Sequence, residues 1–181
     1  MAEKQKKTGL IIVYTGDGKG KTTAALGICL RAAGYDMKAA IVQFVKGSWH
    51  CGELDGIKKL SPNVEIFTGG KGFVGISDDN LPHEEHVKAA QDTLKFAEEL
   101  IASGKYDIII LDELNVAVSL RLIDIGDVLT LLDKKPDNMD IVITGRDAHR
   151  DLIERADLVT EMKEIKHPFN KGVIAQKGID Y

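Results

Sequence analysis

Three glycines, two lysines and three threonines are concentrated in residues 15–23, which read Thr-Gly-Asp-Gly-Lys-Gly-Lys-Thr-Thr. Glycines let backbone N–H groups curl around an anion, and a helix that begins at such a loop adds its unpaired donors and the positive end of its dipole. A lysine adds a full positive charge. The residues expected to hold a phosphate group are Gly16, Gly18, Lys19, Gly20, Lys21, Thr22 and Thr23.

The spacing of this loop is one residue shorter than the usual phosphate-loop pattern, in which four residues separate the first glycine from Gly-Lys-Ser/Thr. Here only three residues separate Gly16 from Gly20, so the loop is a variant. Lys21 is expected to contact phosphate directly. The Thr22 hydroxyl is expected to reach a Mg²⁺ ion that the phosphates also bind.

Two adjacent carboxylates, Asp112 and Glu113, follow the apolar run of residues 108–111. The ligands of parallel sheets gather at the carboxyl ends of the strands, so this pair is predicted to lie beside Thr22. We expect one of the two to hold Mg²⁺. Alone, the pair would also fit an ordinary acidic start of a helix, but the phosphate loop favours the metal site.

Two further residues are weaker candidates. Arg146 follows the apolar run of residues 141–144 and is predicted to emerge on the same rim, as a ligand contact or as a solvated charge. Phe73 is flanked by glycines and either covers a flat ligand or folds back into the core.

The elements that position these residues alternate between strand and helix. Five short apolar runs are typical of buried strands: residues 10–14, 39–45, 64–67, 108–111 and 141–144. Helical patterns cover residues 21–33, 84–101 and 126–132. Runs that are apolar on both sides are typical of a parallel sheet that is covered by helices on both faces. The prediction is a single α/β domain over residues 10–181, preceded by a flexible N-terminus over residues 1–9.

Composition excludes several classes of partner. The 181-residue chain has a net charge of −4, with 24 basic and 28 acidic residues, so we expect no nucleic-acid partner. No apolar run approaches the roughly 18 residues that a membrane span needs, so we expect no membrane role. Two isolated cysteines without a CxxC pattern favour a reducing, cytoplasmic location.

Several longer strings resemble the P-loop family of ATP:corrinoid adenosyltransferases, from about residue 10 to residue 181. They lie at residues 16–23, 42–49, 52–53, 111–114, 144–146, 149–151, 166–169 and 172–181. Generic P-loop proteins have no reason to share the last of these, and the shortened loop is itself the family's form. The resemblance implies a P-loop NTPase-like (RecA-like) fold with a mainly parallel sheet.

The reaction that this resemblance implies is transfer of the 5′-deoxyadenosyl group of ATP to the Co(I) of a corrinoid, with release of triphosphate, in adenosylcobalamin synthesis or salvage. Carbon, not phosphorus, would be attacked. By residue matching, Asp17 and Arg31 fall at nucleotide-side positions, Glu113 at the metal position and Arg146 on the corrinoid side. The expected catalytic residues are Lys21, Phe73, Glu113 and Arg146.

The resemblance also implies partners. Relatives are homodimers, and in some of them a flavoprotein reduces the cobalt once a Phe and a second aromatic have removed its lower axial ligand. Here Phe73 matches the first aromatic, but the second position is Gly75. Another aromatic must then act there, or the step differs.

Two other functions fit part of the sequence. The two nucleotide motifs alone would suit a phosphotransferase or ATPase, which attacks phosphorus. Gly75 leaves room for a corrinoid carrier that does not form the carbon–cobalt bond.

Overall fold

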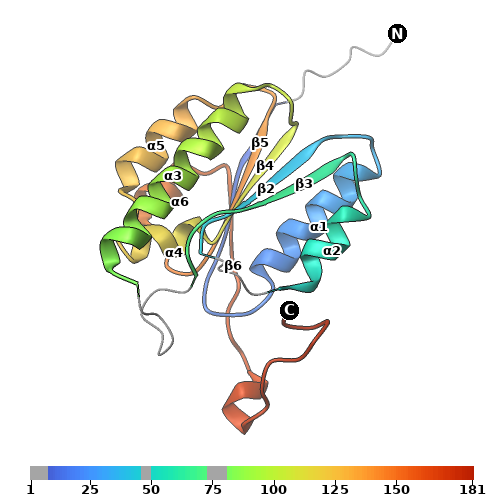
Figure 1. The fold of residues 1–181 in the computed structure, drawn as a ribbon, viewed down its shortest axis with the longest axis vertical. Helices are drawn as coiled ribbons and strands as arrows, with labels where there is room; N and C mark the ends of the chain where they lie inside the picture. The colour runs from blue at the N-terminus through green and yellow to red at the C-terminus, as the bar shows by residue number, and fades with distance from the viewer. Residues whose placement is uncertain (1–7, 46–49, 73–80) are drawn as a thin grey trace.

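A single parallel sheet of six strands forms the centre of the protein (Figure 1). The computed structural model describes residues 8–45, 50–72 and 81–181. Within these residues the strand order is β3-β2-β4-β5-β1-β6, and all neighbouring strands are parallel. The strands are β1 (Ile11–Thr15), β2 (Ala39–Gln43), β3 (Val64–Thr68), β4 (Ile108–Asp112), β5 (Asp140–Thr144) and β6 (Leu158–Glu161).

Helices cover both faces of the sheet, as the apolar strand runs predicted (Figure 1). Two lie on one face, α1 (Lys21–Ala33) and α2 (Gly52–Lys58). The other face carries α3 (His83–Ala102), α4 (Leu114–Ser119), α5 (Ile125–Asp133) and α6 (Arg150–Arg155). Each face has its own buried apolar cluster, and alternate side chains of the central strands enter each of them. Within the described residues, no helix combines the length and apolar character that a membrane crossing requires.

The five predicted strands and three predicted helices are all present. The sequence did not predict β6, because this edge strand has only four residues and all four are exposed. It also did not predict α2, α4 and α6, which have seven, six and six residues. Helices of this length carry too few apolar positions to show a helical period.

The strand order brings three chain segments to one edge of the sheet. β5 lies between β1 and β4, and Tyr14 pairs with Thr144 while Leu111 pairs with Ile143. The carboxyl end of β1, where the phosphate loop begins, and Asp112 at the end of β4 therefore flank Thr144. After β6, the chain leaves the sheet, forms the 3₁₀ helix η1 (Pro168–Lys171), and returns below this edge (Figure 1).

The N-terminal end of the described fold is tied to the loop that leads into β5. Near the N-terminus, the buried Gly9 donates its N–H to Asp137 O at 2.6 Å and accepts a hydrogen bond from Lys135 Nζ at 3.0 Å. Residues 1–7 lie outside the described residues, so the predicted flexible terminus stays a prediction.

One backbone position at the carboxyl edge requires glycine. Gly145 has φ +127°, and a Cβ there would lie 2.9 Å from Asn115 Cβ and 3.0 Å from Val116 N. We predict that Gly145→Ala lowers the free energy of unfolding by about 2 kcal/mol, measured by urea titration. Gly27→Ala is the matched control, because Gly27 lies mid-helix with nothing within 4 Å of the added Cβ. There alanine should stabilise by ~0.5–1 kcal/mol. Equal effects at both positions would contradict the steric argument.

Candidate nucleotide and metal site

The phosphate loop connects β1 to α1 with glycines where other residues would be strained. Gly16 and Gly20 have φ of +95° and +112°. A Cβ on Gly18 would lie 2.7 Å from Met162 O, the atom to which the Gly18 N–H donates at 2.7 Å. Helix α1 begins with no side-chain cap at Gly20, so its first N–H groups are available to an anion.

The Lys21 side chain is held inside the loop. Lys21 is 8% exposed, and its Nζ donates to Gly16 O at 2.6 Å and to Gly18 O at 2.8 Å. These bonds use two of the three donors of the ammonium group. Burial lowers the Lys21 pKa, and the nearby Glu113 carboxylate opposes that shift. The positive charge is thus fixed at the centre of the loop.

The two carboxylates at the carboxyl end of β4 have different surroundings. Asp112 is 2% exposed and accepts three hydrogen bonds: from Thr22 Oγ1 at 2.8 Å, from Thr144 Oγ1 at 2.8 Å and from Gln43 Nε2 at 3.3 Å. Glu113 instead has a left-handed backbone, with φ 61° and ψ 21°, and lines the cavity beside the loop. Asp112 is therefore in direct contact with Thr22, and Glu113 lines the same cavity as Thr22.

This donor set suits Mg²⁺, which binds hard oxygen ligands and takes few of them from protein. The described residues contain no group of three or more His, Cys, Asp or Glu side chains that could hold a metal alone. A hydroxyl and one or two carboxylates, completed by phosphate oxygens and water, are what such an ion uses at a phosphate loop. The residues present fit the ion.

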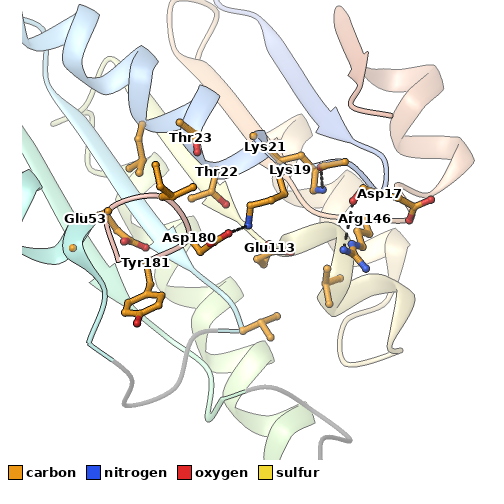
Figure 2. Close-up of a pocket in the computed structure, with 18 residues that line it drawn as sticks. Asp17, Lys19, Lys21, Thr22, Thr23, Glu53, Glu113, Arg146, Asp180 and Tyr181 are labelled. Carbon is orange, nitrogen blue, oxygen red and sulfur yellow. Dashed lines mark hydrogen bonds and ion pairs between the residues drawn. The ribbon is translucent and has the colours of Figure 1, made fainter. Parts of the chain in front are cut away.

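A cavity of about 780 Å³ lies over the loop (Figure 2). Figure 2 shows Asp17 and Arg146 toward one end and Glu53 and Tyr181 toward the other, with Lys21 and Thr22 between them. The lining residues are Asp17, Gly18, Lys19, Gly20, Lys21, Thr22, Thr23, Leu26, Val45, Gly52, Glu53, Glu113, Val116, Arg146, Gly178, Ile179, Asp180 and Tyr181.

Most of the predicted site residues converge on this cavity. Arg146 lies beside the loop, where its Nη2 donates to Asp17 O at 3.4 Å. Its charge contributes to the lowered pKa of Lys21. Arg31, by contrast, is exposed in the last turn of α1 and is not among the lining residues, so its contact with nucleotide stays a prediction. Phe73 and Gly75 lie outside the described residues.

The C-terminal segment forms a wall of the cavity that the sequence did not predict. Gly178, Ile179, Asp180 and Tyr181 line it, and the Asp180 carboxylate forms an ion pair with Lys19 (Figure 2). The Lys19 ammonium and then the Gln176 N–H, at 2.7 Å, hold the Asp180 pKa below its usual range. In the sequence, the only signal for this segment was the resemblance of residues 172–181 to the family, and these residues contain no motif of known chemistry.

Solved structures with a similar fold indicate the class of protein to which the chain belongs. The chain resembles the flagellar accessory protein FlaH of Methanocaldococcus jannaschii (TM-score 0.56, 14% identity, 86% of this chain and 71% of that chain). It also resembles a KaiC-like protein of Pyrococcus horikoshii OT3 (TM-score 0.55, 14% identity, 88% and 75%). With the phosphate loop, this fold places the chain among the P-loop NTPase-like proteins.

Sequence comparison then defines the family. Residues 7–181 match the family described as ATP:corrinoid adenosyltransferase BtuR/CobO/CobP. The chain is 37% identical to the corrinoid adenosyltransferase of Escherichia coli K12 over 181 residues, which cover all of this chain and 90% of the relative. It is 42% identical to that of a Sinorhizobium species over 183 residues, with coverages of 100% and 84%. The chain belongs to the ATP:corrinoid adenosyltransferase family.

The ion pair between Lys19 and Asp180 generates a prediction about charge. A triphosphate at the loop would meet the Asp180 carboxylate beside Lys19, so Asp180→Asn should tighten the binding of inorganic triphosphate a few-fold at low salt. The gain should shrink at high salt, because exposed charges are screened. Isothermal titration calorimetry measures both. Asp137→Asn, an exposed carboxylate outside the cavity, is the control. Weaker binding by Asp180→Asn would show that the segment serves as a packing wall, without charge competition.

Proposed function

We propose that this chain transfers the 5′-deoxyadenosyl group of ATP to the Co(I) of a corrinoid and releases triphosphate, in the synthesis or salvage of adenosylcobalamin. The observation that carries the proposal is the family match over residues 7–181, together with a cavity over a shortened phosphate loop. Its relatives in Escherichia coli and a Sinorhizobium species are named corrinoid adenosyltransferases.

The proposed step is a displacement at carbon. The electron pair of Co(I) forms a bond to C5′ of the ribose, and the bond between C5′ and its oxygen breaks. That oxygen leaves with the electron pair as part of triphosphate, so negative charge grows on the leaving group. Groups that are already in place to neutralise this charge lower the barrier without reorganisation.

This chain's residues supply those groups. Lys21 holds a positive charge at the centre of the loop, and the N–H groups at the start of α1 face the same anion. Arg146 adds a second charge beside Asp17, so it serves the phosphate side in this proposal, in addition to the corrinoid side that the resemblance implies. The Lys19 side chain is a third cation at the cavity. Phe73 keeps its proposed place against the corrinoid.

Thr22 and Glu113 are the proposed holders of Mg²⁺, with Asp112 positioning Thr22. When bound, the ion would neutralise part of the triphosphate charge. Asp112 already accepts three hydrogen bonds, whereas Glu113 lines the cavity, which favours Glu113 as the carboxylate ligand.

A homodimer, a flavoprotein that supplies electrons and a cytoplasmic location complete the proposal. The first two rest on the family resemblance, and the location rests on the two cysteines, Cys29 and Cys51, which are buried and form no disulfide.

A single assay separates the proposed transfer from its alternatives. The chain is mixed with ATP, Mg²⁺ and chemically reduced corrinoid, and the light-sensitive spectrum of the adenosylated product and the inorganic product are both followed. Triphosphate with the light-sensitive product is the expected result. Release of ADP and phosphate would show attack at phosphorus, as the resemblance to P-loop ATPases alone would allow. Binding of corrinoid without either product would identify a carrier.

Lys21→Ala tests the role of the loop charge. We expect kcat/KM to fall by ~10²–10³, about 2.7–4 kcal/mol of transition-state stabilisation, because a charge aimed at the leaving group is lost. The far-ultraviolet circular dichroism should remain that of the folded chain. Lys95→Ala, which removes an exposed lysine of α3, is the control and should keep full activity. A near-normal rate in Lys21→Ala would contradict the assignment.

A further inference from the structure

Thr144 connects the two sides of the proposed metal site, although nothing about its type marks it as functional. It is the last residue of β5, the strand between the one that leads into the phosphate loop and the one that ends in the carboxylates, and it is 0% exposed. Its Oγ1 donates to Asp112 Oδ1 at 2.8 Å and accepts the Glu113 N–H at 3.0 Å.

The direction of these bonds is fixed by their partners. A hydroxyl has one proton to donate, and the backbone N–H of Glu113 can only donate, so the Thr144 proton must point to Asp112. The same oxygen, Asp112 Oδ1, accepts the Thr22 hydroxyl proton at 2.8 Å. Thr144 and Thr22 thus occupy the two acceptor positions of one carboxylate oxygen.

The hydrogen bond from the Glu113 N–H to Thr144 helps to hold the backbone conformation of Glu113, and so the direction in which its side chain leaves the backbone. The left-handed backbone of Glu113 is unfavourable for a residue with a Cβ, and it persists only where its surroundings hold it. One holding contact is the bond from its N–H to Thr144. Another is the bond that its carbonyl oxygen accepts from Ala117 N at 3.1 Å, in the first turn of α4. Without the Thr144 hydroxyl, this part-buried N–H would lose that hydrogen bond.

We propose that Thr144 is a positioning residue that sets Thr22 and Glu113 at the distance and direction that a bound Mg·ATP requires. This inference rests on the proposed function for the identity of the ligand. Thr144 does not touch the ligand itself: it acts on Thr22 through Asp112, and on Glu113 through the backbone.

Two substitutions at this position separate shape from hydrogen bonding. Thr144→Val keeps the branched shape of the side chain but removes both bonds, and Thr144→Ser keeps the hydroxyl. Thr93→Val is the matched control, because Thr93 is also a buried threonine whose hydroxyl donates, to Ala89 O at 2.7 Å, but it lies on α3 and does not line the cavity.

The primary measurement is ATP binding at a series of Mg²⁺ concentrations, without corrinoid, by isothermal titration calorimetry. We expect Thr144→Val to need about tenfold more Mg²⁺ for half-maximal tightening of ATP, on the scale of lost second-layer support of a metal site. Thr144→Ser and Thr93→Val should behave as the unmodified chain. In turnover, Thr144→Val should lower kcat more than it raises KM for ATP. A wild-type Mg²⁺ dependence in Thr144→Val, or an equal shift in Thr93→Val, would overturn the proposal.

A double substitution tests whether Thr144 acts through Glu113. If it does, the Mg²⁺ shift in Thr144→Val combined with Glu113→Gln should be smaller than the sum of the two single shifts, because the part that acts through Glu113 cannot be lost twice. Fully additive shifts would overturn the coupling. Because these binding measurements need no transfer to corrinoid, they stand even if the assay of the proposed function gives ADP and not triphosphate.

Discussion

The hydrogen bond between Thr22 and Asp112 joins the start of α1 to the carboxyl end of β4, across the intervening strand β5, and the arrangement of the cavity depends on it. Thr22 belongs to the first turn of α1, and Asp112 ends β4, two strands away from the strand that leads into that helix. A buried carboxylate is costly unless donors surround it, and here three side chains do so. The carboxylate therefore specifies where each of those three side chains lies.

The fold could be predicted from the sequence because the inner strands are buried on both faces. Residues 108–111 are apolar without alternation, and the structure buries every one of them between two helical layers. The same rule failed for β6, an exposed edge strand held mainly by backbone pairing to β1, which leaves little trace in side-chain type.

The candidate site could be predicted only where function depends on local spacing. The loop glycines, Lys21 and Thr22 are close together in the sequence, so their order and spacing alone indicate a phosphate-binding loop. The wall made by residues 178–181 depends on the path of the whole C-terminal segment, which no local pattern encodes. Arg31 lies at the opposite end of α1 from the phosphate loop, so its assignment to the nucleotide rests on the family resemblance alone.

The order in which the chain is synthesised differs from the order in which the site is assembled. Residues 15–23 emerge early, but the strand that must lie beside β1 ends at Thr144, and the backbone that contacts Gly18 belongs to Met162. A ribosome-bound chain that has reached residue 120 contains every residue of the phosphate loop and both carboxylates, yet it lacks the strand that separates them. The site should therefore become able to bind a nucleotide late in synthesis and in a single step, when β5 inserts between β1 and β4.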